Sequence, residues 1–183
     1  MLATYTSTIG KTVRDIDQGT DIGVVTGLLL DPGHQAVGAV ILSGGKAIRL
    51  KAISSFGRDA IMVNTRAQRE DAENQSLVNQ FNKVGSVIKK TIVARDGEEV
   101  GVVEDVLFDC FSGELQFFVV SGGALQKLMM GGPRYLVAEF VLTIGPDHVI
   151  AKGGAADAIV KEYSGLERIF KRIQQSLSAT EDQ

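Results

Sequence analysis

Residues that could carry chemistry are few in this chain of 183 residues. It has two histidines, His34 and His148, and a single cysteine, Cys110. The histidines fall in predicted turns at positions that do not correspond between the two halves of the chain. No set of Cys and His residues has the spacing of a metal site, and a lone cysteine forms no internal disulfide. The sequence therefore predicts no metal centre and no cofactor, and we expect the Cys110 thiol to have no chemical role.

Aspartates are the remaining candidates for acid–base chemistry. Asp15, Asp17 and Asp21 lie close together, and Asp31 and Asp109 occupy equivalent positions in the two halves. An aspartate at the end of a strand usually accepts hydrogen bonds from the backbone of the following turn, so we expect these side chains to cap turns. Catalysis needs a nucleophile, a base and an orienting group in one cleft. The sequence shows no such set, and we expect the protein not to be an enzyme.

An internal repeat indicates which elements position these residues. Three apolar blocks of the first half recur in the second half, each shifted by 78 residues without a gap. The blocks lie at 22–25, 28–31 and 39–45, and their copies lie at 100–103, 106–109 and 117–123. They are rich in β-branched and large apolar residues, which favour strands, and the third block ends in a Gly-Gly pair typical of a tight hairpin. The repeat predicts two similar units in tandem.

Short strands separated by frequent turns indicate small β-barrels. We therefore predict an all-β fold with minor α content, made of two tandem barrels of about six strands each. We expect the first unit at 1–65, a partly helical linker at 66–84 and the second unit at 85–154. A C-terminal amphipathic helix with a polar tail is expected at 155–183. Within the first unit, 52–56 is predicted to be a turn.

The second unit differs from the first by an insertion after its Gly-Gly pair. The eleven residues 124–134 occur where the first unit needs only two. Loops normally lie in water, but this one contains several large apolar side chains. They are Leu125, Leu128, Met129 and Met130. The loop either packs on its own barrel or binds a partner.

The C-terminal segment has the periodicity of an amphipathic helix. Its apolar residues recur at steps of three and four, as they do on one face of a helix. They are Ile159, Tyr163, Leu166, Phe170, Ile173 and Leu177. Such a helix either packs on a barrel, pairs with a second copy or docks on a partner. Leu166, Phe170 and Ile173 therefore join the apolar loop as candidate partner-binding residues.

Charge argues against a protein that wraps nucleic acid through a uniformly basic body. The net charge is −3, and residues 1–83 carry 9 basic and 8 acidic residues while the remainder carries 10 and 14. A local basic group, Lys46, Arg49, Lys51 and Arg58, is a candidate RNA or phosphate patch, with solvated surface charge as the alternative. The first residues lack the pattern of a signal peptide, and no stretch reaches the roughly 18 apolar residues of a membrane span. We expect a cytoplasmic protein with at most peripheral membrane contact.

The repeated blocks resemble the PRC-barrel domain. In the first unit the pattern comprises Asp21–Val25, 28–31, 39–45, Ile48–Ile53 and Gly57–Val63, and in the second it comprises Glu99–Gly123, 135–138 and 147–150. Members of the family often have proline after the fourth strand, where this chain has Lys51 in the first unit and Glu139 in the second. The resemblance implies about six strands in each unit and a role in binding or assembly, with no catalytic residues.

Three hypotheses about function result. The first is a non-catalytic adaptor that holds protein partners through its barrel surfaces, the apolar loop and the C-terminal helix. The second, from resemblance to the ribosome maturation factor RimM, is an RNA- or ribosome-associated factor. The third, from resemblance to the reaction-centre H subunit, is a peripheral component of a photosynthetic or other membrane complex. The adaptor is favoured because few aromatic residues for base stacking lie near the basic group and no membrane helix is predicted.

Overall fold

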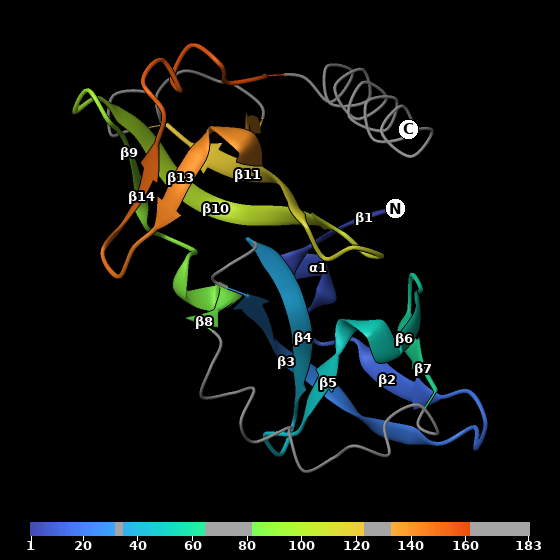
Figure 1. Cartoon of the computed structure of the whole chain (residues 1–183). Coiled ribbons are helices and arrows are strands. Elements are labelled where there is room, and N and C mark those ends of the chain that lie inside the picture. Colours follow the sequence, from blue (N-terminus) through green and yellow to red (C-terminus); the bar gives the residue numbers. More distant parts are fainter. Residues whose placement is uncertain (32–34, 65–81, 123–132, 162–183) are drawn as a thin grey trace, which may run out of the picture.

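The fold was obtained as a computed structural model, which describes residues 1–31, 35–64, 82–122 and 133–161. It consists of two seven-stranded sheets, one from each unit. In Figure 1 the second unit, green to orange, lies above the first unit, blue to teal. The fold is mostly β, as the sequence predicted.

The first unit forms a curled sheet. Its strands are β2 (Thr12–Asp15), β3 (Asp21–Asp31), β4 (Ala36–Leu42), β5 (Ala47–Arg49), β6 (Ile53–Phe56) and β7 (Ala60–Val63), and the 3-10 helix η1 (Leu50–Ala52) joins β5 to β6. Their order is β5-β4-β3-β2-β7-β6. The sheet curls because β3 pairs with β2 through its first residues and with β4 through its second half. The pair formed by β2 and β7 is parallel.

The second unit repeats this arrangement. Its elements are β9 (Thr91–Ala94), β10 (Glu99–Asp109), β11 (Leu115–Ser121), β12 (Arg134–Val137), the 3-10 helix η6 (Ala138–Phe140), β13 (Val141–Ile144) and β14 (His148–Ala151). The strand order is β12-β11-β10-β9-β14-β13, again with one parallel pair, β9 and β14. Each element therefore has an equivalent in the other unit.

The repeated blocks form the longest strands of both sheets, β3 with β4 and β10 with β11, which confirms the predicted tandem β units. Two details differ from the prediction. The stretch 52–56 is not a turn, because it contains all of β6, which pairs with β7. In addition, neither sheet is closed by hydrogen bonds between its end strands within the described residues.

The two units exchange their N-terminal arms. Strand β1 (Leu2–Thr4), which leads into the short helix α1 (Tyr5–Thr8), pairs with β10 of the second sheet, and β8 (Asn82–Lys83), which leads into the 3-10 helix η4 (Val84–Ser86), pairs with β3 of the first sheet. Thr4 lies opposite Leu107, and Lys83 lies opposite Leu29. Because Leu29 and Leu107 are equivalent in the repeat, the exchange is reciprocal (Figure 1). The boundaries predicted from the sequence did not anticipate it.

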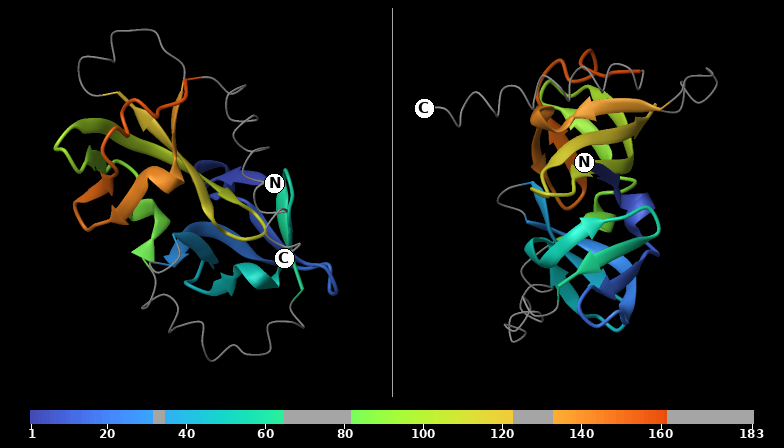
Figure 2. Two further views of the ribbon diagram at one scale, coloured as in Figure 1. Left: turned by 45° about the horizontal axis from the view of Figure 1, so that its top comes forward. Right: turned by 90° about the vertical axis from the view of Figure 1, so that its right-hand side faces the viewer.

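An approximate two-fold axis relates the units. Ala36 and Glu114 form an isolated antiparallel bridge between them. These two positions are 78 residues apart and therefore equivalent in the repeat. A position that pairs with its own equivalent lies on a two-fold axis, as in the interface of a symmetric dimer. Figure 2 shows the two units from two further sides, with the second unit above the first.

Two backbone hydrogen bonds flank the bridge. The Val37 N–H donates to the Gly113 carbonyl over 2.7 Å, and the Leu115 N–H donates to the Gln35 carbonyl over 3.0 Å. The approximate two-fold axis relates these two hydrogen bonds, because Val37 is equivalent to Leu115 and Gly113 is equivalent to Gln35. The interface within this one chain thus has the form of a symmetric contact between two protomers.

One hydrophobic core extends through both units. The largest cluster of buried residues includes Leu28 and Leu30 of the first unit and Phe108 and Phe118 of the second. Phe56 of the first unit meets Phe108 edge to face, with ring centroids 5.9 Å apart and ring planes at 76°. Such aromatic pairs contribute about 0.5–1.5 kcal/mol beyond their burial. Each unit has in addition one smaller buried cluster of its own, around Ile41 in the first unit and Phe117 in the second.

The chain after β14 turns back to the edge of the second sheet. Val160 and Tyr135 exchange two backbone hydrogen bonds of 2.9 Å, and Ile159 packs against the core. The described start of the C-terminal segment is therefore a turn followed by a bridge. Residues 153–158 form turns and Val160 pairs with Tyr135, and the rest of the predicted C-terminal helix lies outside the described residues.

Candidate binding site at the junction of the two units

Two grooves lie where a turn of one unit meets the 3-10 helix of the other. The apolar groove, of about 300 Å³, lies between η1 and β6 of the first unit and the β10–β11 turn of the second. The acidic groove, of about 360 Å³, lies between Gln35 of the first unit and η6, β11 and β13 of the second. The two grooves correspond in their 3-10 helices, because η1 and η6 are equivalent in the repeat, but β11 also lines the acidic groove.

The apolar groove is lined mainly by hydrophobic side chains. Leu50, Ile53 and Phe56 contribute from the first unit, and Phe111 contributes from the second. Lys51 is the only charged side chain among the described residues that line it. The groove therefore offers apolar contact area with one positive charge beside it.

Phe111 is the most unusual residue of this groove, because 94% of its surface is exposed. A tight turn fixes its backbone: the Asp109 carboxylate accepts hydrogen bonds from the Phe111 N–H over 2.8 Å and the Ser112 N–H over 3.0 Å. The Gly113 N–H donates to the Asp109 carbonyl over 2.8 Å. Burying a side chain of this size contributes about 1.5–3 kcal/mol, and the exposed Phe111 ring does not gain this contribution in the described structure.

The folded structure shifts the pKa values of the two titratable groups of this turn, Asp109 and Cys110, in opposite directions. Partial burial opposes ionisation of Asp109, but the hydrogen bonds from Ser112, the chain's amino group and Phe111 outweigh it and lower the pKa of the carboxyl. Burial raises the pKa of the adjacent Cys110 thiol. This shift disfavours the thiolate, which is the reactive form of the thiol, and whether Cys110 has a chemical role stays a prediction.

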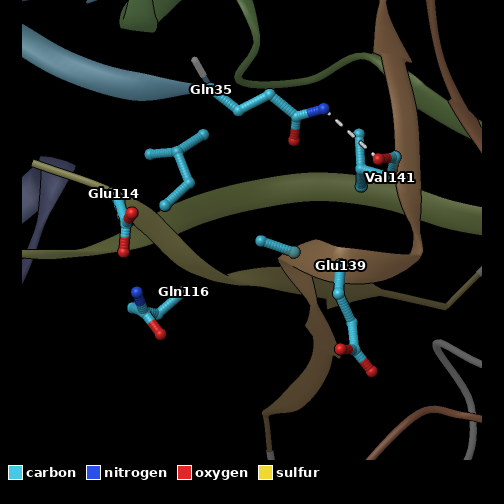
Figure 3. Close-up of a pocket in the computed structure, with 7 residues that line it drawn as sticks. Gln35, Glu114, Gln116, Glu139 and Val141 are labelled. Atoms are coloured by element: carbon cyan, nitrogen blue, oxygen red, sulfur yellow. Dashed lines mark hydrogen bonds between the residues drawn. The ribbon is translucent and has the colours of Figure 1, made fainter. Parts of the chain in front are cut away.

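The acidic groove has a different chemical character. Glu114, Gln116 and Glu139 surround it, with no Lys or Arg among its described lining residues. Figure 3 shows the Gln35 side chain reaching from the first unit to the second, where its amide donates to the Val141 carbonyl over 3.3 Å. This groove is polar and negatively charged where its counterpart is apolar and positively charged.

Two of the aspartates predicted to cap turns, Asp15 and Asp109, do so. The Asp15 carboxylate accepts from the backbone N–H of Asp17 over 2.7 Å and of Gln18 over 3.1 Å. Asp21 forms an ion pair with Arg14 at 2.6 Å. Within the described part of the chain, no cluster of three or more His, Cys, Asp or Glu side chains could hold a metal ion.

The four predicted basic residues lie on separate pieces of the first unit. Lys46 is in the β4–β5 turn, Arg49 ends β5, Lys51 is in η1 and Arg58 is in the β6–β7 turn. The Arg58 side chain is 92% exposed, and its Nε lies 3.4 Å from an oxygen of Asp59. Of the four, Lys51 lines the apolar groove. Their role as an RNA or phosphate patch stays a prediction.

The predicted partner-binding residues lie outside the described residues. They are Leu125, Leu128, Met129 and Met130 of the loop and Leu166, Phe170 and Ile173 of the terminal segment. The sequence reasoning missed Phe111, whose only signal is its place in a turn, between Cys110 and the Ser112-Gly113 pair. A large apolar residue in a tight turn is worth noting, because that turn position normally faces solvent.

A comparison with known families matches this architecture. The model of the PRC-barrel domain matches residues 2–69 and again residues 80–157. The chain therefore belongs to the PRC-barrel family, and it carries two copies of the domain. PRC-barrel domains are found in proteins with roles in protein interaction and assembly. No curated protein matches the sequence. None of the described helices is long and apolar enough to cross a membrane.

Proposed function

We propose that the chain is a non-catalytic adaptor that binds a protein partner through the apolar groove at the junction of its two units. The observation that carries this proposal is Phe111, which is fixed in a tight turn with 94% of its surface exposed. Binding hot spots are typically aromatic residues that become fully desolvated in a complex. A preformed turn also reduces the entropy lost on binding.

The lining of the groove defines the partner surface that fits it. Leu50, Ile53 and Phe56 accept an apolar side chain, and Phe111 covers a second one. Lys51 at the edge favours a neighbouring carboxylate on the partner, which increases the association rate and selectivity more than affinity. The expected partner segment therefore combines an apolar residue with an acidic residue.

Purification of the tagged protein from its native host, with mass spectrometry of the captured proteins, tests the proposal. Phe111→Ser should abolish capture of the specific partner, because it removes the exposed aromatic surface. The matched control is Leu142→Ser, since Leu142 is 40% exposed but does not line the groove. Unchanged capture by the Phe111→Ser variant would contradict this site.

Nuclease treatment of the same preparation separates the adaptor from the RNA-associated alternative. Partners held directly by protein contacts survive nuclease. If the captured set consists of ribosomal proteins that disappear after nuclease, the predicted basic group gains support and the adaptor proposal fails. In that case replacing Lys46, Arg49 and Arg58 with Glu should release the RNA.

The apolar loop and the terminal helix predicted from the sequence would extend the same binding role. Replacing Leu128, Met129 and Met130 together with Ser should then remove partner capture while the thermal unfolding transition is retained. Loss of that transition would show that the loop belongs to the core. This variant leaves Phe111 unchanged. Its result therefore concerns a second binding surface and does not affect the test of the apolar groove.

A further inference from the structure

We propose that the interface between the two units also joins two copies of this chain, with the first unit of each copy docking on the second unit of the other. The partner is thus a second copy of the same chain in an exchanged dimer. The basis is the approximate two-fold axis at the Ala36–Glu114 bridge. A two-fold interface forms equally well within a chain and between chains, because the same contacts are made in both cases.

The contacts across this interface are non-covalent and specific. They include the reciprocal hydrogen bonds of Val37 and Leu115, the pairing of β1 with β10 and of β8 with β3, and the edge-to-face contact of Phe56 with Phe108. None of them depends on which chain supplies each unit. The covalent connection between the units is the segment 65–81, which is 17 residues long.

That connection sets the balance between the two forms. Tethering through a segment of this length gives the units an effective concentration on the order of 1 mM. The closed monomer therefore predominates at micromolar concentrations, with roughly 1% exchanged dimer at about 10 μM. Near 1 mM, or where an assembly gathers many copies, the two forms become comparable.

Exchange would change the proposed binding site as well as the oligomeric state. Each apolar groove would then combine Leu50 and Phe56 of one chain with Phe111 of the other. The dimer would present two such grooves, and a partner with two matching segments would gain from bivalent binding. This consequence rests on the proposed function, whereas the exchange itself does not.

A disulfide across the two-fold axis tests the exchange. The hydrogen bonds that flank Ala36 and Glu114 identify them as a non-hydrogen-bonded antiparallel pair, for which the Cα atoms lie about 4.5 Å apart, within the range of a disulfide. Two variants of the full chain are made with Cys110→Ser, one with Ala36→Cys and the other with Glu114→Cys. They carry different tags and are unfolded, mixed and refolded together at about 1 mM, then oxidised.

The expected product is a disulfide-linked dimer that carries both tags, with the fraction of chains in it falling about threefold when refolding takes place at tenfold lower concentration. The control chain carries both substitutions and should close the disulfide within itself. Absence of the mixed dimer when this control closes would overturn the proposal. Sedimentation velocity of the unsubstituted protein refolded at about 1 mM provides a second test: a monomer alone would also overturn it. Neither readout depends on partner capture.

Discussion

The two grooves at the junction share an equivalent 3-10 helix and have opposite chemistry. The apolar groove lies between η1 and the β10–β11 turn of the other unit, and the acidic groove lies between η6 and Gln35 of the other unit. The apolar groove contains Lys51 and the acidic groove contains Glu139, at equivalent positions of η1 and η6. Both residues occur where the family often has proline. The approximate symmetry of the backbone is kept at the contact between the units, while different side chains give the two grooves different surface chemistry.

The same contrast appears next to the two-fold axis. Gln35 and Gly113 are equivalent, and both have positive φ angles, 47° and 79°. The Gln35 side chain has room to reach Val141, whereas a Cβ at Gly113 would lie 2.2 Å from the Val37 carbonyl oxygen. The two-fold relation therefore holds for the backbone hydrogen bonds but not for the space around them.

The largest effect is expected from the shared core. Phe108→Ala should lower the free energy of unfolding by about 3–5 kcal/mol, and Leu30→Ala, at the equivalent position, by about 2–5 kcal/mol. Because both side chains belong to one core, each variant should still unfold in a single transition in denaturant. Two separate transitions, one for each unit, would contradict a common core.

Substitution at the two-fold axis should lower the free energy of unfolding nearly as much as substitution in the shared core. Gly113→Ala is expected to lower the free energy of unfolding by about 2–4 kcal/mol, because it adds overlap with Val37 to the strain of a positive φ. Gly97→Ala is the matched control, since Gly97 has a φ of 90° and a Cβ added there would have no neighbour within 4 Å. It should cost only about 1–2 kcal/mol. Equal losses of stability for Gly113→Ala and Gly97→Ala, measured by thermal denaturation, would show that small shifts of the neighbouring atoms relieve the overlap.

A smaller effect is expected from the turn that presents Phe111. The folded state lowers the pKa of Asp109 below its usual value of 3.8, so the ionised carboxylate stabilises the fold above pH 4 and this contribution is lost as the pH falls below 4. Asp109→Asn should therefore be less stable than the natural protein by about 1 kcal/mol at pH 7. The gap should close as the pH approaches 3, and a constant gap would contradict the electrostatic origin.

The smallest change in stability is expected from exchanging the charges of the two grooves. Lys51→Glu and Glu139→Lys should each alter the free energy of unfolding by less than about 0.5 kcal/mol, since both are surface positions. Only Lys51→Glu should weaken partner binding, by about three- to tenfold, through a slower association rate. Equal weakening by Glu139→Lys, measured by surface plasmon resonance with the captured partner, would show that the grooves do not differ in function.

The sequence predicted the elements whose side chains repeat. The blocks at 22–31 and 100–109 have the same register and composition, and they form β3 and β10. It did not predict the exchanged arms, because β1 and β8 contain only three and two residues. Segments of two or three residues are too short to show a periodic pattern. Their pairing is determined by the strand of the other unit that they contact.

The binding site was harder to predict than the fold. Lys51 was identified as a charged residue but not as part of a groove, since the groove forms only when η1 meets the turn of the other unit. Phe111 has no sequence pattern that separates an exposed aromatic residue from a buried one. Its exposure follows from the turn fixed by Asp109 and from the place of that turn at the junction.

The exchanged arms also determine the order in which the protein can fold during synthesis. Strand β1 pairs with Leu107–Asp109, so the first residues to emerge have no partner until more than half of the chain has been made. The first unit likewise lacks its seventh strand until Asn82 and Lys83 appear. Contacts so distant in sequence form late and slowly, and unpaired strand edges are prone to aggregation while they wait. A nascent first unit therefore keeps an incomplete sheet until the second unit has been made.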